Sequence, residues 1–317
     1  MEGNFRGKMI DISCILINYN TSKYTLACIK SILENTTAFI KFEIIVVDNA
    51  SESVDYKLLA NEILALRQDN IKLVRSKINT GFGGGNMIGV QNSENCKYYA
   101  FINNDTLLKS PDTFKNLIAF MDENADAAVC SPQMVDEHGN FRKTLDHFSS
   151  PFREIFKRGS LELLWPKRYP SRKKTYTSPI KVDYIQGAFM FINADYFNKT
   201  GGFDTNLFLY YEEADLCRRL LKEQNKHTFL IPSLQYIHFQ SMSSSNNLKM
   251  KVEQKISLFY YIRKHFGWLN YKILQLYFSL HYFFSSILKP KNWPLFLLIV
   301  TGIPISKSLK QKQQIHQ

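Results

Sequence analysis

The segment FEIIVVDNAS, Phe42 to Ser51, combines two features that together predict the fold. Its first six residues, Phe42 to Val47, form a short β-branched run, which is typical of a buried strand in a parallel sheet. Polar residues follow directly, beginning with Asp48. Since ligands of open α/β sheets bind beyond the carboxyl ends of the strands, the segment predicts an α/β fold with a polar site at this strand end.

The same arrangement recurs at Tyr98 to Ile102, an apolar run that is followed by the polar residues Asn103 to Asp105. Between the two strands lies NTGFGGGNMIGV, residues 79–90, a glycine-rich turn that leads into a helical segment. Glycine lets the backbone approach a ligand closely because it has no Cβ, and a flexible loop is the alternative for Gly83 to Gly85. We expect these polar clusters to meet at one edge of the sheet.

A third polar cluster lies within GAFMFINADYFNKTGGFDTNLFLYYEEADLCRRL, Gly187 to Leu220. A helix beginning near Tyr211 places Glu212, Glu213 and Asp215 in its first turn, where unpaired amides and the positive end of the dipole stabilise carboxylates. Such a cluster can hold a base or a cation, or it can simply complement the dipole.

Taken in order, these motifs resemble family 2 glycosyltransferases with the GT-A fold. The motifs are ILINYN from Ile15, VVDNAS from Val46, NTGF from Asn79, NND from Asn103, GGFD from Gly201 and EEADL from Glu212. Within that family the chain looks most like the rhamnosyltransferase-type enzymes of bacterial surface-polysaccharide synthesis. The resemblance, which covers roughly Ile10 to His238, implies a Rossmann-like domain with a mixed central sheet, which we place at residues 1–249. The change of composition from Met250 predicts a helical, membrane-associated extension at residues 250–317.

The resemblance implies a nucleoside-diphospho-sugar donor. Asp48 lies where the family recognises a pyrimidine, and its carboxylate can accept a hydrogen bond from the base N3–H. The same resemblance implies donor contacts for Tyr19, Asn20, Asn79, Gly81, Asn86, Asn103 and Asn104.

A divalent cation is also implied, because Asn103 to Asp105 corresponds to the family's acidic metal-binding motif with its first aspartate replaced by asparagine. Asp105 can ligate Mg2+ or Mn2+ while the donor diphosphate fills other positions. Because the motif has one carboxylate fewer, we expect the cation to bind more weakly when the donor is absent. His238 stands where many relatives carry a histidine that completes the metal or pyrophosphate site, and a packed core histidine is the alternative.

The implied reaction is a single displacement with inversion, in which a carboxylate removes the proton of the attacking acceptor hydroxyl. Glu213 aligns with the aspartate of the family's Glu-Asp pair, and its longer side chain leaves Glu212 or Asp215 as substitutes. Like charges this close should raise one pKa toward neutrality. Gln186 and Gly187 are placed on the acceptor side, although Gln186 can equally tie down a turn.

Composition restricts the partners and the compartment. The formal net charge is +12, with basic residues gathered between Arg153 and Lys174 and again at the C-terminus. The first cluster can bind the diphosphate of a lipid-linked acceptor or form a solvated loop. We find no module that would bind nucleic acid. Five cysteines without metal-ligand spacing, and no signal-peptide pattern, predict reduced thiols in a cytoplasmic protein.

The C-terminal part is rich in aromatic residues between lysines and arginines. Trp268 to Leu288 predicts an aromatic helix, and the apolar stretch Trp293 to Ile305 is shorter than the ~20 residues of a bilayer span. We expect an interfacial helix or hairpin whose lysines contact anionic lipid, which places the protein peripherally at the inner face of the cell membrane. Burial against the catalytic domain or a dimer partner is the alternative.

The sequence therefore predicts transfer of a sugar, with rhamnose as the first choice, to a saccharide or lipid-linked saccharide. A nucleotidyltransferase on a similar sheet is one alternative, but it needs a basic residue after the glycine-rich loop, where NMIGV supplies none. The other alternative is a membrane-peripheral partner protein that has lost activity. The missing first aspartate of the metal-binding motif and the glutamate at position 213 favour this alternative.

Overall fold

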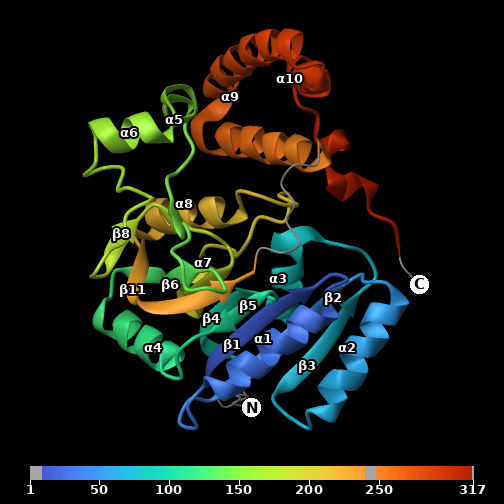
Figure 1. The fold of residues 1–317 in the computed structure, drawn as a ribbon, viewed down its shortest axis with the longest axis vertical. Coiled ribbons are helices and arrows are strands. Elements are labelled where there is room, and N and C mark those ends of the chain that lie inside the picture. Colours follow the sequence, from blue (N-terminus) through green and yellow to red (C-terminus); the bar gives the residue numbers. More distant parts are fainter. Residues whose placement is uncertain (1–8, 240–247, 316–317) are drawn as a thin grey trace, which may run out of the picture.

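The computed structural model describes residues 9–239 and 248–315, and a mixed sheet of nine strands forms its centre (Figure 1). The strand order is β3-β2-β1-β4-β10-β6-β11-β5, with β8 paired to β11. The first four strands are mutually parallel, and β10 is antiparallel to both of its neighbours. The strands of this sheet are β1 (Ile10–Asn18), β2 (Phe42–Asn49), β3 (Ile71–Ser76), β4 (Cys96–Asn103), β5 (Thr106–Leu108), β6 (Ala127–Val135), β8 (Ile180–Val182), β10 (Phe189–Asn193) and β11 (His227–His238).

Helices cover both faces of the sheet, and each face has its own apolar core. In β1, Cys14 and Leu16 face the core beneath α1, α2 and α4, whereas Ile15 faces the core beneath α3, α7 and α8. This double burial confirms the predicted buried parallel strands. The helices are α1 (Ser22–Glu34), α2 (Ser53–Ala65), α3 (Gly81–Gln91), α4 (Thr113–Glu123), α5 (Pro151–Phe156), α6 (Arg158–Leu164), α7 (Ala194–Lys199), α8 (Glu212–Gln224), α9 (Leu248–Leu288) and α10 (Trp293–Val300).

The glycine-rich segment is helical from Gly81 onward. The alternative of a flexible loop at Gly83 to Gly85 is therefore wrong. Gly81 adopts φ +75°, and a Cβ there would lie 2.1 Å from the carbonyl oxygen of Phe208. A Cβ on Gly89 would lie 2.4 Å from Ile15. The glycines therefore let α3 lie directly against β1 and against the loop that precedes α8.

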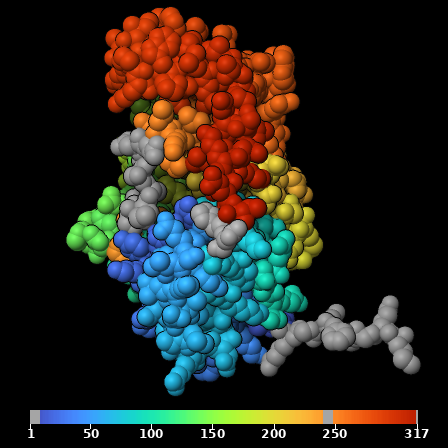
Figure 2. Space-filling model, turned by 90° about the vertical axis from the view of Figure 1, so that its right-hand side faces the viewer, coloured from blue at the N-terminus to red at the C-terminus, as the bar shows by residue number. Residues whose placement is uncertain are grey.

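The C-terminal residues form a helical hairpin whose first helix, α9, packs against α5. α9 changes direction at Gly267, whose φ is +81°, and its second half packs against α10. Figure 2 shows these orange and red segments at the opposite end of the molecule from the blue N-terminal part. Phe259 before the bend and Phe278 after it belong to the same apolar core cluster as residues of α8. The hairpin thus shares a core with the rest of the chain, and the domain boundary between residues 249 and 250 stays a prediction.

All five cysteines are free and buried, as predicted. Within the described ranges, no helix combines the length and apolar character needed to cross a bilayer.

Candidate active site

The polar residues at the ends of β2 and β4 lie at the carboxyl edge of the sheet, as predicted, and Asn18 at the end of β1 lies there too. The register places Asn18 of β1 beside Asp48 of β2, and Ile17 beside Asn103 of β4. Asn18 Nδ2 donates to Asp48 Oδ1 at 3.0 Å, and Arg75 Nε lies 3.5 Å from Asp48 Oδ2. Asp48 is thus a fully buried, paired carboxylate at the base of this edge.

The predicted donor-binding asparagines also hold local backbone in place. Asn20 accepts a hydrogen bond from the Glu52 amide at 2.8 Å, and Asn79 accepts one from the Gly81 amide at 2.9 Å. Asn86 donates to a carbonyl one turn earlier in α3, and Asn104 donates to Thr21 and Thr25. Tyr19 remains exposed beside them. Donor contact by these residues stays a prediction.

Asp105 and His238 meet across the β5–β11 pairing. Asp105 Oδ1 lies 2.9 Å from His238 Nε2, and Asn103 Nδ2 lies 3.4 Å from the same nitrogen. Across residues 9–239 and 248–315, no three His, Cys, Asp or Glu side chains are grouped closely enough to hold a metal ion. The oxygen and imidazole ligands suit Mg2+ or Mn2+, but the described residues supply two of them, Asp105 and His238, and the substrate would have to supply others.

A cavity of about 410 Å³, which we call the catalytic pocket, opens between this edge and the start of α8. It brings together six predicted site residues from four separate segments of the chain: Asn103, Gln186, Gly187, Glu212, Glu213 and His238. Of its other walls, Arg158 belongs to the basic cluster between Arg153 and Lys174, for which the sequence allowed binding of an acceptor diphosphate. The sequence assigned no role to the remaining walls: Phe82, Asp146, Tyr184, Ala188, Leu209, Tyr210, Tyr211 and Gln254.

A strained turn places the two glutamates. Tyr210 and Tyr211 have φ of +74° and +73°, a left-handed conformation that costs a non-glycine residue about 1–3 kcal/mol. Contacts from α9 hold the turn, since Ser257 Oγ donates to the Leu209 carbonyl at 2.7 Å and the Tyr261 ring packs on Tyr211. The helix then begins at Glu212, within one residue of the prediction.

The two glutamates differ in their ionisation. Burial, followed by the charge of Asp146, raises the pKa of Glu213 to about 7, although backbone amides oppose the shift. Burial and the neighbouring Glu213 raise the pKa of Glu212 well above its ordinary value, and its Oε1 has no hydrogen-bond partner in the described structure. Glu213 can therefore exchange a proton near neutral pH, whereas burial favours the protonated form of Glu212.

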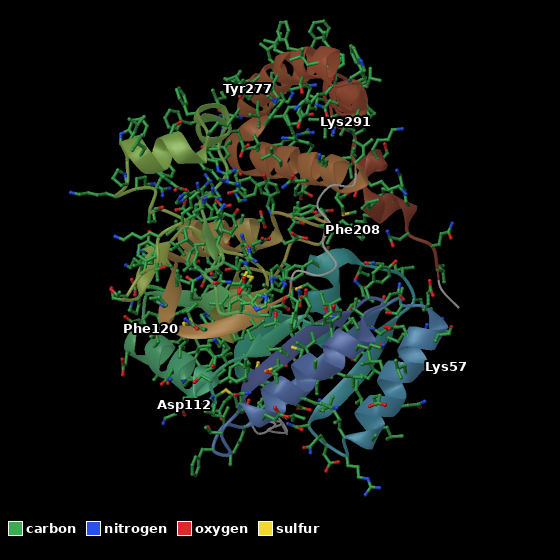
Figure 3. The ribbon with its side chains drawn as sticks, viewed as in Figure 1. Lys57, Asp112, Phe120, Phe208, Tyr277 and Lys291 are labelled. Atoms are coloured by element: carbon green, nitrogen blue, oxygen red, sulfur yellow. The ribbon has the colours of Figure 1, made fainter. Side chains whose placement is uncertain are left out.

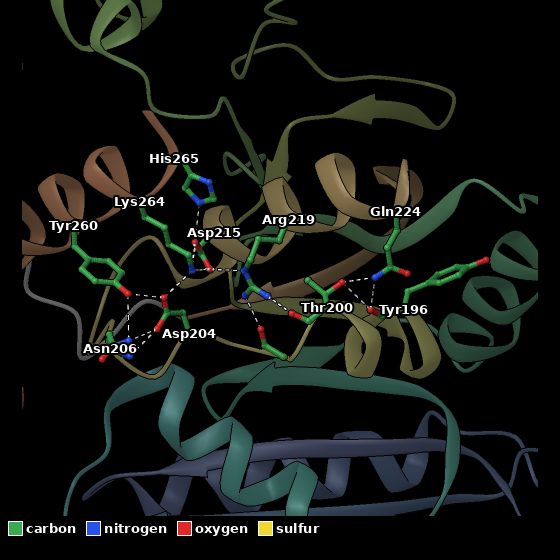
Figure 4. A network of polar contacts seen from close by, with 11 residues as sticks. Tyr196, Thr200, Asp204, Asn206, Asp215, Arg219, Gln224, Tyr260, Lys264 and His265 are labelled. Carbon is green, nitrogen blue, oxygen red and sulfur yellow. Dashed lines mark hydrogen bonds and ion pairs between the residues drawn. The ribbon is translucent and has the colours of Figure 1, made fainter. Parts of the chain in front are cut away.

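Asp215 faces away from the catalytic pocket into a network of charges between α8 and α9 (Figure 4). Lys264 Nζ, His265 Nε2 and Arg219 Nε all lie 2.8 Å from its carboxylate oxygens. Burial opposes its ionisation, but these partners outweigh burial and lower the pKa of Asp215 to about 2. Such an acid is a poor proton acceptor at neutral pH, so Asp215 is a weaker candidate base than Glu213.

Asp146 was missed because its sequence context is unremarkable. It lies on β7 (Leu145–Asp146), which pairs with β9 (Tyr184–Ile185), and it forms ion pairs with Arg153, Arg158 and Arg172 at 3.1–3.3 Å. The signal that could have pointed to Asp146 was the run of basic residues, because buried basic side chains need an acidic partner.

Comparison with known proteins now identifies the class. The profile of Glycosyl transferase family 2 matches residues 13–201, more than half of the chain, so the chain belongs to this family. A curated relative, the low-salt glycan biosynthesis hexosyltransferase Agl10 of Haloferax volcanii, is 25% identical over 219 residues, which span 67% of this chain and 62% of that protein. The chain thus matches less than two thirds of the length of that relative.

Solved structures confirm the predicted GT-A fold. GalNAc-T7 with UDP, GalNAc and Mn2+ has a TM-score of 0.63 at 16% identity, covering 83% of this chain and 50% of that one. The mannosyltransferase PcManGT from Pyrobaculum calidifontis, in complex with GDP-Man and Mn2+, has a TM-score of 0.56 at 13% identity and covers 80% and 64%. S. aureus TarS 1-349 has a TM-score of 0.53 at 16% identity and covers 93% and 81%.

Proposed function

We propose that the protein is an inverting glycosyltransferase that moves a sugar from a pyrimidine nucleoside-diphosphate donor to a saccharide or lipid-linked saccharide. The observation that carries this proposal is the catalytic pocket, where Glu213 with a pKa near 7 shares one cavity with Asn103 and His238. Rhamnose is the first donor sugar to test because of the motif resemblance. The similarity to a hexosyltransferase of glycan synthesis makes other hexoses the second choice.

In this mechanism, Glu213 accepts the proton of the acceptor hydroxyl as that oxygen attacks the anomeric carbon and the nucleoside diphosphate leaves. Gln186 and Gly187 line the same pocket and would orient the acceptor. Asp105 and His238 would hold Mg2+ or Mn2+, which when bound neutralises charge on the leaving diphosphate. Mn2+ in two similar structures supports this assignment.

The Asp105→Ala protein tests the donor site. We expect calorimetry with Mn2+ to show binding of deoxythymidine or uridine diphosphate that the substitution weakens about tenfold or more, because a charged ligand is lost. Without Mn2+, the variant and the wild type should bind equally weakly. Asp112→Ala, which removes an exposed carboxylate at the start of α4, is the matched control. Absence of nucleotide binding by the wild type contradicts the transferase proposal and favours an inactive partner protein.

We also propose that the C-terminal hairpin binds an anionic membrane surface. After the bend, α9 exposes apolar side chains at helical spacing, with the charged residues Lys289 and Lys291 at its end. A stripe of this kind, with lysines beside it, suits the interface of an anionic bilayer. The apolar stripe consists of Leu269, Ile273, Leu276, Leu280, Phe284 and Ile287.

The double variant Leu280→Gln, Phe284→Gln should bind phosphatidylglycerol-containing vesicles at least about tenfold more weakly than the wild type in co-sedimentation, because two large apolar contacts are lost. Val54→Gln, an exposed apolar position on α2, should leave binding unchanged. Vesicle binding that survives the double variant contradicts the proposal. If sedimentation velocity instead shows a dimer that the double variant dissociates, the stripe is a dimer interface.

A further inference from the structure

A second cavity of about 250 Å³, which we call the basic pocket, adjoins the catalytic pocket. The two cavities share Arg158, Tyr211 and Gln254 in their walls. The basic pocket lies where α5 packs against α9. Its complete lining is Arg153, Glu154, Lys157, Arg158, Tyr211, Gln254, Lys255 and Leu258.

Positive charge exceeds negative charge in this pocket, since four cations face one carboxylate. Glu154 is already paired with Arg153, and Asp146 behind the wall pairs with Arg153 and Arg158. Neither Lys157 nor Lys255 has a carboxylate within 4.0 Å among the residues that the structure describes. Two ammonium groups are therefore left without an anion at close range.

Lys255 is the most unusual of these cations, because its charge lies against aromatic rings. Its Nζ is 3.8 Å from the ring centre of Phe278 and 5.6 Å from that of Tyr282. Burial, with the added repulsion of Lys157 and Arg153, lowers the pKa of Lys255 to about 8, although Glu154 opposes the shift. A bound anion would reverse this shift, because an opposite charge nearby favours the protonated form.

Unused hydrogen-bond donors point to the same kind of ligand. Arg153 is only 3% exposed, and its Nε and the Nε of Arg158 are buried without a hydrogen-bond partner in the described part of the chain. Guanidinium N–H groups match the spacing of phosphate oxygens, and ammonium groups supply point charges for the remaining oxygens.

We propose that the basic pocket binds the phosphate groups of the acceptor, so that the saccharide attached to them reaches Glu213 in the adjoining catalytic pocket. This inference rests on the proposed transferase function and names its acceptor class, a saccharide that carries a phosphodiester or diphosphate. The position also fits a lipid carrier. Lys157 Nζ lies 5.1 Å from the ring centre of Tyr277. Tyr277 lies in the second half of α9, near α5 (Figure 3). The apolar stripe lies on the same half of α9.

The test is calorimetry of the full chain in EDTA, where metal-dependent binding to the donor site is suppressed, with geranyl diphosphate and inorganic pyrophosphate as probes. Lys255→Gln should weaken binding of the probe about tenfold, since one charged partner is removed. Lys157→Gln, at an exposed position whose loss should not affect folding, should weaken it by a smaller factor. Lys251→Gln removes an exposed lysine one turn earlier on α9 and should have no effect.

Binding of deoxythymidine diphosphate with Mn2+ is measured on the same proteins, so that the two proposals can fail separately. Loss of probe binding in Lys255→Gln, with nucleotide binding intact, supports the phosphate site. Tighter binding of geranyl diphosphate then assigns it to a lipid carrier, and equal binding of both probes assigns it to a phosphorylated glycan in solution. If the wild type binds nucleotide but neither probe, or if the lysine variants bind the probes as the wild type does, the phosphate site is overturned and the transferase proposal stands.

Discussion

Replacing Glu213 by glutamine is expected to lower the turnover number by about 10²–10⁴, the usual contribution of a positioned general base. The amide keeps the size and shape of the carboxyl group, but it has one acceptor oxygen instead of two and cannot accept the proton of the acceptor hydroxyl. Nucleoside-diphosphate release from a panel of nucleotide sugars measures the loss. Binding of nucleotide with Mn2+ should be unchanged, because Glu213 acts on the acceptor side.

The pH profile distinguishes a base from a residue that merely shapes the pocket. With a pKa of about 7, Glu213 is protonated below neutrality and deprotonated above it, so the rate of the wild type should rise as pH increases through 7. This limb should disappear in Glu213→Gln.

Glu212→Gln is the matched control for this experiment. Burial and the neighbouring Glu213 raise the pKa of Glu212 well above its ordinary value, which favours the protonated form that an amide resembles. We expect a loss of less than about fivefold, far below that of a general base. If Glu212→Gln lowers the turnover number more than Glu213→Gln does, Glu212 is the general base and Glu213 is not.

The local sequence pattern was sufficient to predict the carboxyl edge of the sheet and the position of Glu212 and Glu213 at the start of a helix. Apolar strands followed by polar residues define the carboxyl edge wherever helices cover both faces of a parallel sheet, which is why Asp48 and Asn103 were placed correctly there. The start of α8 at Glu212 was likewise visible from acids that precede an amphipathic pattern.

The sequence was less informative wherever distant segments decide the chemistry. Glycines lower helix propensity, so a flexible loop was the alternative for Gly83 to Gly85, yet close packing of the segment against β1 and Phe208 outweighs that preference. Lys255 gave no signal because its environment combines α5 with both halves of α9, which no spacing along the chain reveals. Asp215 looked like a third catalytic acid until its partners appeared about 50 residues further along the chain.

Asp215→Asn is expected to lower the free energy of unfolding by about 3 kcal/mol at pH 7, since removing one partner of a buried ion network leaves the other charges uncompensated. Lys264 would keep Asp204, 2.7 Å away, whereas Arg219 would lose its carboxylate. Urea unfolding measures the change. Asp195→Asn, which breaks an exposed i,i+4 pair with Lys199, should stay within about 0.5 kcal/mol of the wild type.

The same substitution changes the response to acid. Folding lowers the pKa of Asp215 from its ordinary 3.8 to about 2, so the stability that its charge contributes is complete above pH 3.8 and is lost as pH falls toward 2. Of the wild-type advantage over Asp215→Asn, about 2 kcal/mol should therefore disappear as the pH is lowered through this window. A variant as stable as the wild type at pH 7 but without transferase activity would reject the structural role of Asp215. It would restore Asp215 as a candidate base, because a charge needed only to join α8 to α9 cannot be lost without a cost in stability.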